Sequence, residues 1–370
     1  MRIKVAVAGA TGAVGQRFIQ LLQNHPWFQL NEVLASESSK GKKLKDACKF
    51  SLFDMPEEAG NMIIKGLDEK IESRIVFSAL PSDVAGDAEE GFVEQGAVVA
   101  SNAGHHRMEK NVPLVIPEVN HEHLEIVRGK KAFIITNANC TTTQLVLALK
   151  PLHDTFGISK VSVVSMQALS GAGYPGVSSM DIADNVLPHI KGEEEKVERE
   201  PLKILGVLDT NGKGSGNEDG DGDVNRNENR DGKRNENNAD IIDADISISA
   251  SCNRVNVTDG HLECVSVKLS RDAGIDEVKR ALTNFSSIPQ EMELPSAPLR
   301  SIIYSDDPDR PQPRLDRDKG KGMSVVVGRL KPDNVLDFRF HVLGHNTIRG
   351  AAGGSILNAE LLYALGYLEN

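Results

Sequence analysis

The chain has 370 residues, of which 39% are hydrophobic and 26% are charged, and this balance excludes a disordered, collagen-like or coiled-coil protein. Its 42 basic and 53 acidic residues give a net charge of −11, so we expect no nucleic-acid partner and no binding to an anionic membrane. No apolar run approaches the roughly 18 residues of a membrane span, and the N-terminal residues lack a signal-peptide layout. The four cysteines are widely spaced and include no CxxC motif. We therefore expect a cytoplasmic enzyme with reduced thiols and no bound metal.

Strand and helix patterns alternate through the first 140 residues. Short apolar runs predict strands at 3–8, 28–35, 75–80, 97–101 and 133–136. Helical spacing of apolar residues predicts helices at 14–24, 82–95 and 121–128. A β-α-β-α order implies a parallel sheet with helices on its faces.

The pattern changes after about residue 140. Apolar and polar residues alternate around Val265 and Val267, and again around Phe338 and Phe340, which is typical of an antiparallel or mixed sheet with one buried face. The polar face must be solvated or covered, and we expect a second subunit there, in a homodimer or homotetramer. Cys264, at the start of this strand, is expected in the core, as a small buried residue. A helical pattern returns at 349–368.

The segment 209–239 consists almost entirely of Asn, Asp, Gly, Glu, Arg and Lys. It cannot bury enough apolar surface to offset its ordering entropy, so we expect a disordered surface insertion. Its run of Asp219, Asp221 and Asp223 resembles a calcium loop, but Val224 replaces the glycine and Arg230 the glutamate that such a loop requires. A solvated loop is the favoured interpretation.

A glycine-rich turn joins the first predicted strand to the first predicted helix. Gly9, Gly12 and Gly15 form the spacing G-x-x-G-x-x-G rather than the commoner G-x-G-x-x-G. Small residues let the backbone approach a pyrophosphate, and the helix N-terminus supplies N–H groups and a positive dipole. The alternative is a tight turn with packing glycines, but the position of the turn favours dinucleotide binding.

The loop after the second predicted strand favours NADP as the cofactor. An NAD site usually places an acid here to hold the ribose 2′-hydroxyl. The sequence instead offers Ser36, Ser39 and the nearby Lys40, Lys42 and Lys43, which suit a 2′-phosphate. Glu37 is a competing interpretation because it is able to serve as that acid.

Cys140 lies in the run Thr-Asn-Ala-Asn-Cys-Thr-Thr-Thr-Gln, directly before a helical pattern. The N-terminus of a helix lowers the pKa of a thiol and favours the thiolate, so Cys140 is the candidate nucleophile. The alternative for any lone cysteine is a small buried residue. His261 and Arg254 share one segment, and they are candidates for a proton-transfer group and for a carboxylate-binding cation. If the segment is extended, Arg254 and Asn256 face away from the inward-pointing Val255 and Val257.

Four motifs occur in an order that resembles the aspartate-β-semialdehyde dehydrogenase family, closest to its archaeal and fungal branch. They are the turn at 9–15, the thiol motif at 137–143, the run Gln-Ala-Leu-Ser-Gly-Ala-Gly at 167–173 and the segment at 253–261. The stretch from Gly344 to Gly353 is also similar to that family's C-terminal helix entry. The resemblance covers nearly the whole chain except 209–239, where the family has a much shorter connection.

The resemblance implies a role for individual residues. Cys140 matches the nucleophile, His261 the acid/base catalyst and Gln167 the residue that orients the substrate. Substrate-binding positions are matched by Arg254, which would bind the α-carboxylate, by Glu193 and Lys196, and by the phosphate-binding Arg107. The choice of Glu193 over Glu194 and Glu195 stays open. Positions that line the NADP site are matched by Gly9, Thr11, Gly12, Ala13, Val14, Ser36, Ser39, Ser170, Gly171 and Asn346.

The implied fold is α/β, with an N-terminal Rossmann-like domain at 1–139 plus 347–370. A second α+β catalytic and dimerisation domain is expected at 140–346, built on a mixed or antiparallel sheet. The implied reaction is the NADPH-dependent reductive dephosphorylation of L-aspartyl-4-phosphate to L-aspartate 4-semialdehyde, in lysine, threonine and methionine biosynthesis. The alternatives are a malonyl-CoA-type acyl-CoA reductase and a catalytically silent NADP-binding regulator.

Overall fold

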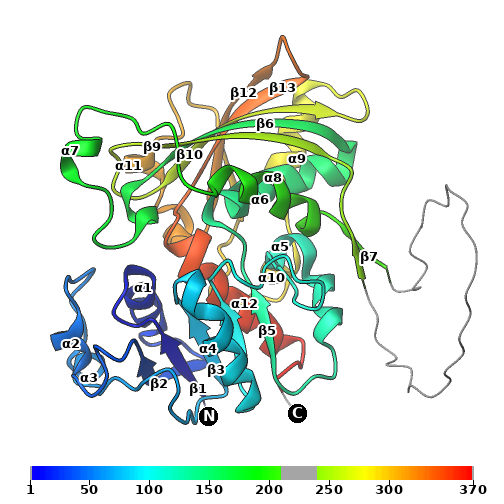
Figure 1. Ribbon diagram of the computed structural model, residues 1–370. Helices are drawn as coiled ribbons and strands as arrows, with labels where there is room; N and C mark the ends of the chain where they lie inside the picture. The colour runs from blue at the N-terminus through cyan, green and yellow to red at the C-terminus, as the bar shows by residue number, and fades with distance from the viewer. Residues whose placement is uncertain (1, 210–239, 369–370) are drawn as a thin grey trace, which may run out of the picture.

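The computed structural model describes residues 2–209 and 240–368, and its N-terminal part is built on a five-stranded parallel sheet (Figure 1). The strand order is β2-β1-β3-β4-β5, and every neighbouring pair is parallel. The strands are β1 (Ile3–Ala8), β2 (Phe28–Leu34), β3 (Ile75–Ser78), β4 (Val98–Ser101) and β5 (Phe133–Thr136). All five predicted strands are confirmed, with ends that differ by at most two residues.

Helices cover both faces of this sheet, as the β-α-β-α order predicts. The long ones are α1 (Ala13–Leu22), α4 (Ser82–Glu94) and the C-terminal α12 (Gly353–Ala364). The predicted helix at 121–128 is wrong in type: a short α5 (Pro117–Asn120) leads into a 3-10 helix, His121–Val127. The helical pattern at 349–368 is a π-helix, Ile348–Ala352, followed by α12. Short helices are α2 (Leu44–Ala47), α3 (Glu57–Gly60), α7 (Ser179–Ile182), α10 (Ile288–Glu291) and α11 (Pro313–Asp316), with 3-10 turns at Leu169–Ala172 and Lys319–Gly322.

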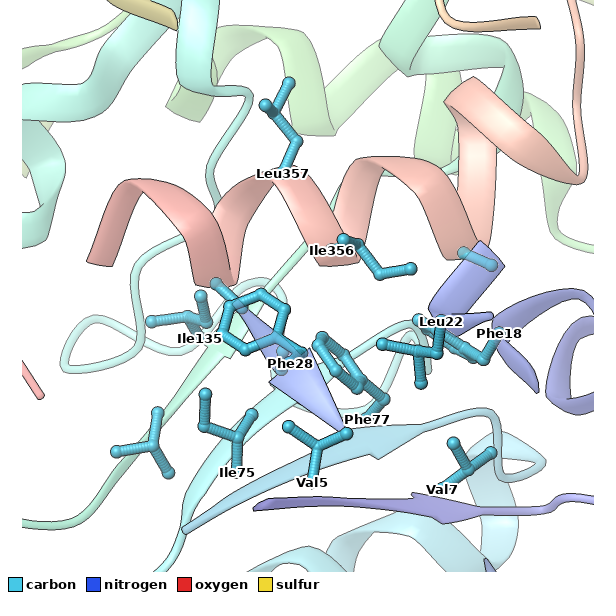
Figure 2. Close-up of a cluster of buried hydrophobic side chains, with 14 of the residues drawn as sticks. Val5, Val7, Phe18, Leu22, Phe28, Ile75, Phe77, Ile135, Ile356 and Leu357 are labelled. Carbon is cyan, nitrogen blue, oxygen red and sulfur yellow. The ribbon is translucent and has the colours of Figure 1, made fainter. Parts of the chain in front are cut away.

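One face of the parallel sheet and the C-terminal helix share a hydrophobic core (Figure 2). Val5 and Phe77 from the sheet, Phe18 from α1 and Ile356 from α12 are all almost fully buried in it. The two aromatic rings stack with their centroids 5.1 Å apart. The last helix therefore packs on the first sheet although almost 220 residues separate α12 from β5, which supports joining 347–370 to 1–139 as one domain. The exact domain boundaries remain a proposal.

The second sheet has six strands in the order β11-β12-β13-β10-β6-β9. It is mixed, because β11 with β12 and β6 with β9 are parallel pairs and the others are antiparallel. Helices α6 (Cys140–Phe156), α8 (Glu193–Ile204) and α9 (Ile275–Thr283) lie on the side that faces the first sheet (Figure 1). The strands are β6 (Ile158–Gln167), β9 (Ser247–Arg254), β10 (His261–Leu269), β11 (Ile302–Ser305), β12 (Val325–Pro332) and β13 (Phe338–Gly344).

The predicted alternation along β10 is confirmed, but it places Cys264 on the other face. Val265 and Val267 are buried against the helices, whereas Cys264 is half-buried on the open face between Val164 and His341. The expectation of a core position for Cys264 is therefore wrong, because successive residues of a strand point to opposite faces. The open face remains the candidate subunit interface.

The polar segment at 209–239 lies, except for Asp209, outside the described residues, and so does the weighed calcium motif. Asp209 itself ends β7 (Val207–Asp209), which pairs antiparallel with β8 (Asp240–Ile242). Asp209 and Asp240, which flank residues 210–239, thus lie side by side. Among the described residues, no helix is long and apolar enough to cross a membrane.

Candidate active site

The Gly9–Gly15 turn has the backbone geometry of a dinucleotide-binding turn. Gly9 has φ +76°, and a Cβ there would lie 2.6 Å from the carbonyl oxygen of Ala79. A Cβ at Gly15 would lie 2.1 Å from the carbonyl oxygen of Gly9, so only glycine fits at either position. Gly12 caps α1, and no described side chain bonds to the free amides of its first turn. Those amides are available to a pyrophosphate, and Thr11, Ala13 and Val14 lie part-exposed beside them.

The loop after β2 places the candidate 2′-phosphate residues on the surface. Ser36 Oγ lies 3.0 Å from Ser38 Oγ, and the amide of Ser39 donates to the carbonyl of Ser36. The ammonium of Lys40 lies 3.1 Å from Glu69 and 3.5 Å from Glu37. Glu37 is therefore engaged by a lysine, and the exposed Ser36 and the part-exposed Ser39 remain the better candidates for contacting the cofactor.

The candidate nucleophile Cys140 is the first residue of α6. Asn139 caps this helix, with Oδ1 accepting from the amides of Thr141 at 2.9 Å and Thr142 at 3.2 Å. Cys140 Sγ lies 3.2 Å from His261 Nε2, although 121 positions separate the two residues. On its other side, a Cβ at Gly350 would lie 2.6 Å from Cys140 Cβ, so the π-helix packs directly against the thiol residue.

The sequence-based expectation of a lowered thiol pKa is wrong for this form of the protein. Burial raises the pKa of Cys140 to about 12, and the charge of Glu193 acts in the same direction. The charges of Arg107 and Arg254 oppose the rise. The helix start does not decide the thiol pKa, because removing the thiolate from water costs more than the helix dipole returns.

His261 begins β10 and is fully buried. Its Nδ1 accepts a hydrogen bond from the amide of Ala168 at 3.0 Å. Since an amide only donates, the proton of the neutral ring is on Nε2, which faces Cys140 Sγ. Burial lowers the pKa of His261 to about 3, and the positive charge of Arg254 adds to this effect, so the ring is neutral near pH 7. It is thus set to donate a hydrogen bond toward the sulfur.

Glu193 is the one member of the Glu193–Glu195 run that reaches the thiol region. Its Oε1 accepts from Gln167 Nε2 at 3.1 Å and from Asn139 Nδ2 at 2.9 Å. Lys196 Nζ lies 3.7 Å from its Oε2. Glu194 instead accepts from the amide of Cys252, and Glu195 pairs with an arginine on the surface. The structure therefore brings Glu193, Gln167 and Lys196 together beside Cys140.

Arg254 ends β9 and its guanidinium is buried next to Cys140 and His261. Nη1 donates to the carbonyl of Ala168 at 2.7 Å, and a Cβ at Gly171 would lie 2.8 Å from it. Arg254 is 5% exposed whereas Asn256 is exposed, so the expected shared outer face is wrong. The strand ends at Arg254 and the chain turns there, which breaks the alternation on which that expectation depended.

Two further sets of candidate site residues lie near Cys140 or near Gly171. Arg107 follows β4 and is buried, and its charge acts on Cys140. Asn346 Nδ2 donates to Ser170 Oγ at 2.8 Å, and its Oδ1 accepts from the amide of Gly260 at 2.9 Å. Ser170 and Asn346, from separate segments, therefore form one edge of the site near Gly171.

Sequence reasoning missed Glu200 and Gly350. Glu200 is buried and accepts from Arg107 and from the amide of Asn139. Its signal was present: it follows Glu193 by seven positions, on the same face of a helix. The only sequence signal at Gly350 was its position in a glycine-rich run. Such a run does not indicate which residue approaches the glycine closely.

A possible metal-ligand set lies on the loop that carries Arg107. His105, His106 and Glu109 offer ligand atoms within 4.8 Å of one another. His106 Nδ1 already shares a hydrogen bond of 2.8 Å with Glu109 Oε1, so two of the three groups are paired with each other. The expectation of no bound metal stays a prediction.

Two family models match this chain and identify its protein family. The family model "Semialdehyde dehydrogenase, NAD binding domain" matches residues 4–127, and "Semialdehyde dehydrogenase, dimerisation domain" matches residues 149–349. Together with a glycine-rich turn of dinucleotide-binding geometry, a thiol–imidazole pair and a second sheet with an open face, these matches show that the chain belongs to the semialdehyde dehydrogenase family.

Relatives with high sequence identity indicate which activity within the family this chain has. The chain is 50% identical to aspartate-semialdehyde dehydrogenase of Archaeoglobus fulgidus over 98% of both chains. It is 45% identical to that of Schizosaccharomyces pombe over 99% of both. The crystal structure of the Candida albicans enzyme with NADP superposes with a TM-score of 0.86 at 41% identity, covering 98% of this chain and 99% of that one. The expected function, aspartate-semialdehyde dehydrogenase of the archaeal and fungal type, is confirmed.

Proposed function

We propose that this protein reduces L-aspartyl-4-phosphate to L-aspartate 4-semialdehyde through an acyl-enzyme on Cys140, with NADPH as the reductant. The observation that carries the proposal is the 3.2 Å contact between Cys140 Sγ and His261 Nε2, inside a ring of groups that suit this substrate. Two buried arginines, a lysine and a glutamate around one thiol match a substrate with a carboxylate, a phosphate and an ammonium group.

The acylation step uses the cations to bind the substrate and its leaving group. Arg254 binds the α-carboxylate and Glu193 the α-ammonium group, while Gln167 orients the carbonyl beside the thiol. The Cys140 thiolate attacks the acyl phosphate carbon, and the tetrahedral adduct collapses to a thioester and releases phosphate. Arg107 and Lys196 neutralise the charge that develops on that phosphate. The thiol proton passes to solvent before the attack, since His261 already carries a proton on the Nε2 that faces the sulfur. Both arginine charges and that N–H favour the thiolate.

The reduction step needs a hydrogen-bond donor at the thioester oxygen. NADPH held along the Gly9–Gly15 turn supplies the hydride. As negative charge builds on the oxygen, His261 donates from Nε2 to the forming thiohemiacetal, and it receives the proton again when that species collapses to the aldehyde. The amide of Ala168 fixes the ring in the required tautomer.

The remaining site residues are assigned to the cofactor. Gly9, Thr11, Gly12, Ala13 and Val14 hold the pyrophosphate, Ser36 and Ser39 the 2′-phosphate, and Ser170, Gly171 and Asn346 the nicotinamide side. Domains at 1–139 plus 347–370 and at 140–346 then divide cofactor binding from catalysis. The open face of the six-stranded sheet is the proposed contact in a homodimer, or in a homotetramer built from it.

The decisive experiment is a spectrophotometric assay of the purified protein. NADP, inorganic phosphate and aspartate semialdehyde together should produce NADPH, and omission of phosphate should stop the reaction. Malonyl-CoA with NADPH is the matched control for the acyl-CoA reductase alternative. Oxidation of NADPH by malonyl-CoA alone would favour that reductase, and NADP binding without turnover of either substrate would favour a regulator.

A further inference from the structure

Glu200, near the end of α8, joins two parts of the site that follow different strands of the parallel sheet, β4 and β5. It is only 2% exposed. Its Oε1 accepts from Arg107 Nη1 at 2.9 Å, and its Oε2 accepts from the amide of Asn139 at 2.7 Å. Asn139 is the cap of α6 and immediately precedes Cys140. One carboxylate thus connects the guanidinium to the residue before the thiol.

The hydrogen bonds of Arg107 leave one of its three nitrogen atoms without a partner among the described residues. Nη1 is held by Glu200, and Nη2 donates to the carbonyl of Asn102 at 2.9 Å. Nε is buried and has no hydrogen-bond partner among the residues that the structure describes. A buried unpaired N–H is costly, which indicates that an acceptor from outside the chain completes it. The acceptor expected beside Cys140 is a phosphate oxygen.

Lys203, three residues further along α8, fixes the loop on which Arg107 sits. Its Nζ donates to the carbonyls of Arg107 at 2.7 Å, Glu109 at 2.8 Å and Val112 at 2.9 Å. These three bonds use every proton of the ammonium group. Glu200 therefore orients the guanidinium while Lys203 fixes the backbone beneath it, and α8 fixes the phosphate-binding loop as a unit.

We infer that Glu200 is a positioning residue for the phosphate step: it holds Arg107 with Nε directed at the leaving phosphate and sets its position relative to Cys140. The inference rests on the proposed function, because it takes Arg107 to be the phosphate-binding cation. The role requires a double acceptor. A glutamine amide has one oxygen and one NH2 group. Its oxygen would accept from one partner, and its NH2 group would then oppose the N–H of the other partner, either Arg107 or the Asn139 amide.

The test is steady-state kinetics in the aldehyde-oxidising direction, with inorganic phosphate varied. Glu200→Gln should raise the KM for phosphate about tenfold or more, while the KM for NADP stays within about twofold. The matched control is Glu198→Gln on the same helix, since Glu198 also accepts a backbone amide, that of Ala250, at 3.0 Å. This control should leave the KM for phosphate unchanged. An equal rise in both KM values for Glu200→Gln would reduce Glu200 to a structural role and overturn the inference.

A double-mutant cycle separates this inference from the proposed function. If Glu200 acts through Arg107, the pair Glu200→Gln with Arg107→Gln should have the same KM for phosphate as Arg107→Gln alone. A rise with Arg107→Gln but none with Glu200→Gln overturns the inference and keeps the role of Arg107. No rise with Arg107→Gln rejects that role and the inference with it. If Glu200→Gln fails to fold, as judged by circular dichroism, Glu200→Asp keeps the charge but is too short for both bonds, and the same outcomes apply to it.

Discussion

The parallel sheet is covered by helices on both faces, whereas the mixed sheet is covered on only one. This difference in burial separates the surfaces available to ligands from the surface available to a second subunit. In β4 of the parallel sheet, the neighbours Val98 and Val99 are both completely buried, one in each of two separate cores. In β6 of the mixed sheet, Val163 is 2% exposed but its neighbour Val164 is 41% exposed. The first sheet is thus closed by helices on both sides and presents only its turns to ligands. The second is closed on one side, and its open face is available to another copy of the chain.

The site lies where the two regions meet, and no single sheet supplies it. Cys140 starts the helix that follows the last parallel strand, while His261 and Arg254 come from the mixed sheet. Cofactor binding is assigned to the first region and chemistry to the junction. Substitutions that affect only one of these functions are therefore the sharpest tests of the comparison.

The largest expected effect comes from Cys140→Ala. Without the nucleophile, turnover should fall by about 10⁴-fold or more, because no acyl-enzyme forms. The dissociation constant for NADP, measured by fluorescence titration, should change by less than about twofold, since the Gly9–Gly15 turn is untouched. Substantial residual activity, or a labelled acyl adduct on another cysteine, would place the nucleophile elsewhere.

Four valines test the difference between the sheets directly. Val98→Asn, Val99→Asn and Val163→Asn each bury an unpaired amide and should lower the free energy of unfolding by about 3 kcal/mol. Val164→Asn should change it by less than about 1 kcal/mol and instead weaken self-association. Urea unfolding and sedimentation at micromolar concentration measure both quantities. If the wild-type protein is a stable, active monomer, the open face is not a subunit interface.

The burial of His261 predicts a pH dependence of stability. Its pKa is about 3 when folded, against an ordinary value of 6.5, so between these limits the unfolded chain binds more protons. Stability therefore rises with pH across this window, and this histidine alone should cost about 2 kcal/mol between pH 6.5 and pH 5. His261→Gln removes the titration, so the same drop in pH should cost that variant about 2 kcal/mol less. Equal losses in urea unfolding of both proteins would contradict the assignment.

The preference for NADP over NAD should depend only on residues of the parallel sheet and its loops. Replacing Ser36 and Ser39 with alanine removes two hydroxyls expected at the 2′-phosphate, and the KM for NADP should rise about tenfold or more. The KM values for NAD and for aspartate semialdehyde should barely move. Equal losses with NADP and NAD would make this loop a structural element instead.

The smallest effect is expected at the edge of the molecule. Asp209 and Asp240 are paired residues of β7 and β8, so residues 210–239 can be replaced by a short glycine-rich bridge without moving either strand. Activity and melting temperature should stay close to those of the intact protein, because loop-closure entropy changes slowly with length. A large loss of activity with the fold preserved would give the segment a role in the site or in assembly.

The sequence by itself determined the elements whose signals are local. Five apolar runs became five parallel strands, since a strand buried on both faces is apolar throughout. The glycine turn was also readable, because Gly9 and Gly15 are required by backbone contacts within a few residues or with the adjacent strand. The order of the site motifs was enough to indicate the family, and the assignment of Cys140 as the nucleophile stays a prediction.

The tertiary structure alone decided everything that depends on burial and on distant partners. Cys140 was expected to have a lowered pKa from its helix position, and burial raises it instead. The choice of Glu193 over Glu194 and Glu195 depended on the structure, because only the Glu193 carboxylate accepts hydrogen bonds from Gln167 and Asn139. The helix spacing placed Glu200 on the same face as Glu193, but its partner Arg107 was fixed only by the packing of α8 against the segment after β4. Local patterns specify which face a residue takes, but its partner is chosen by elements that lie far away in the chain.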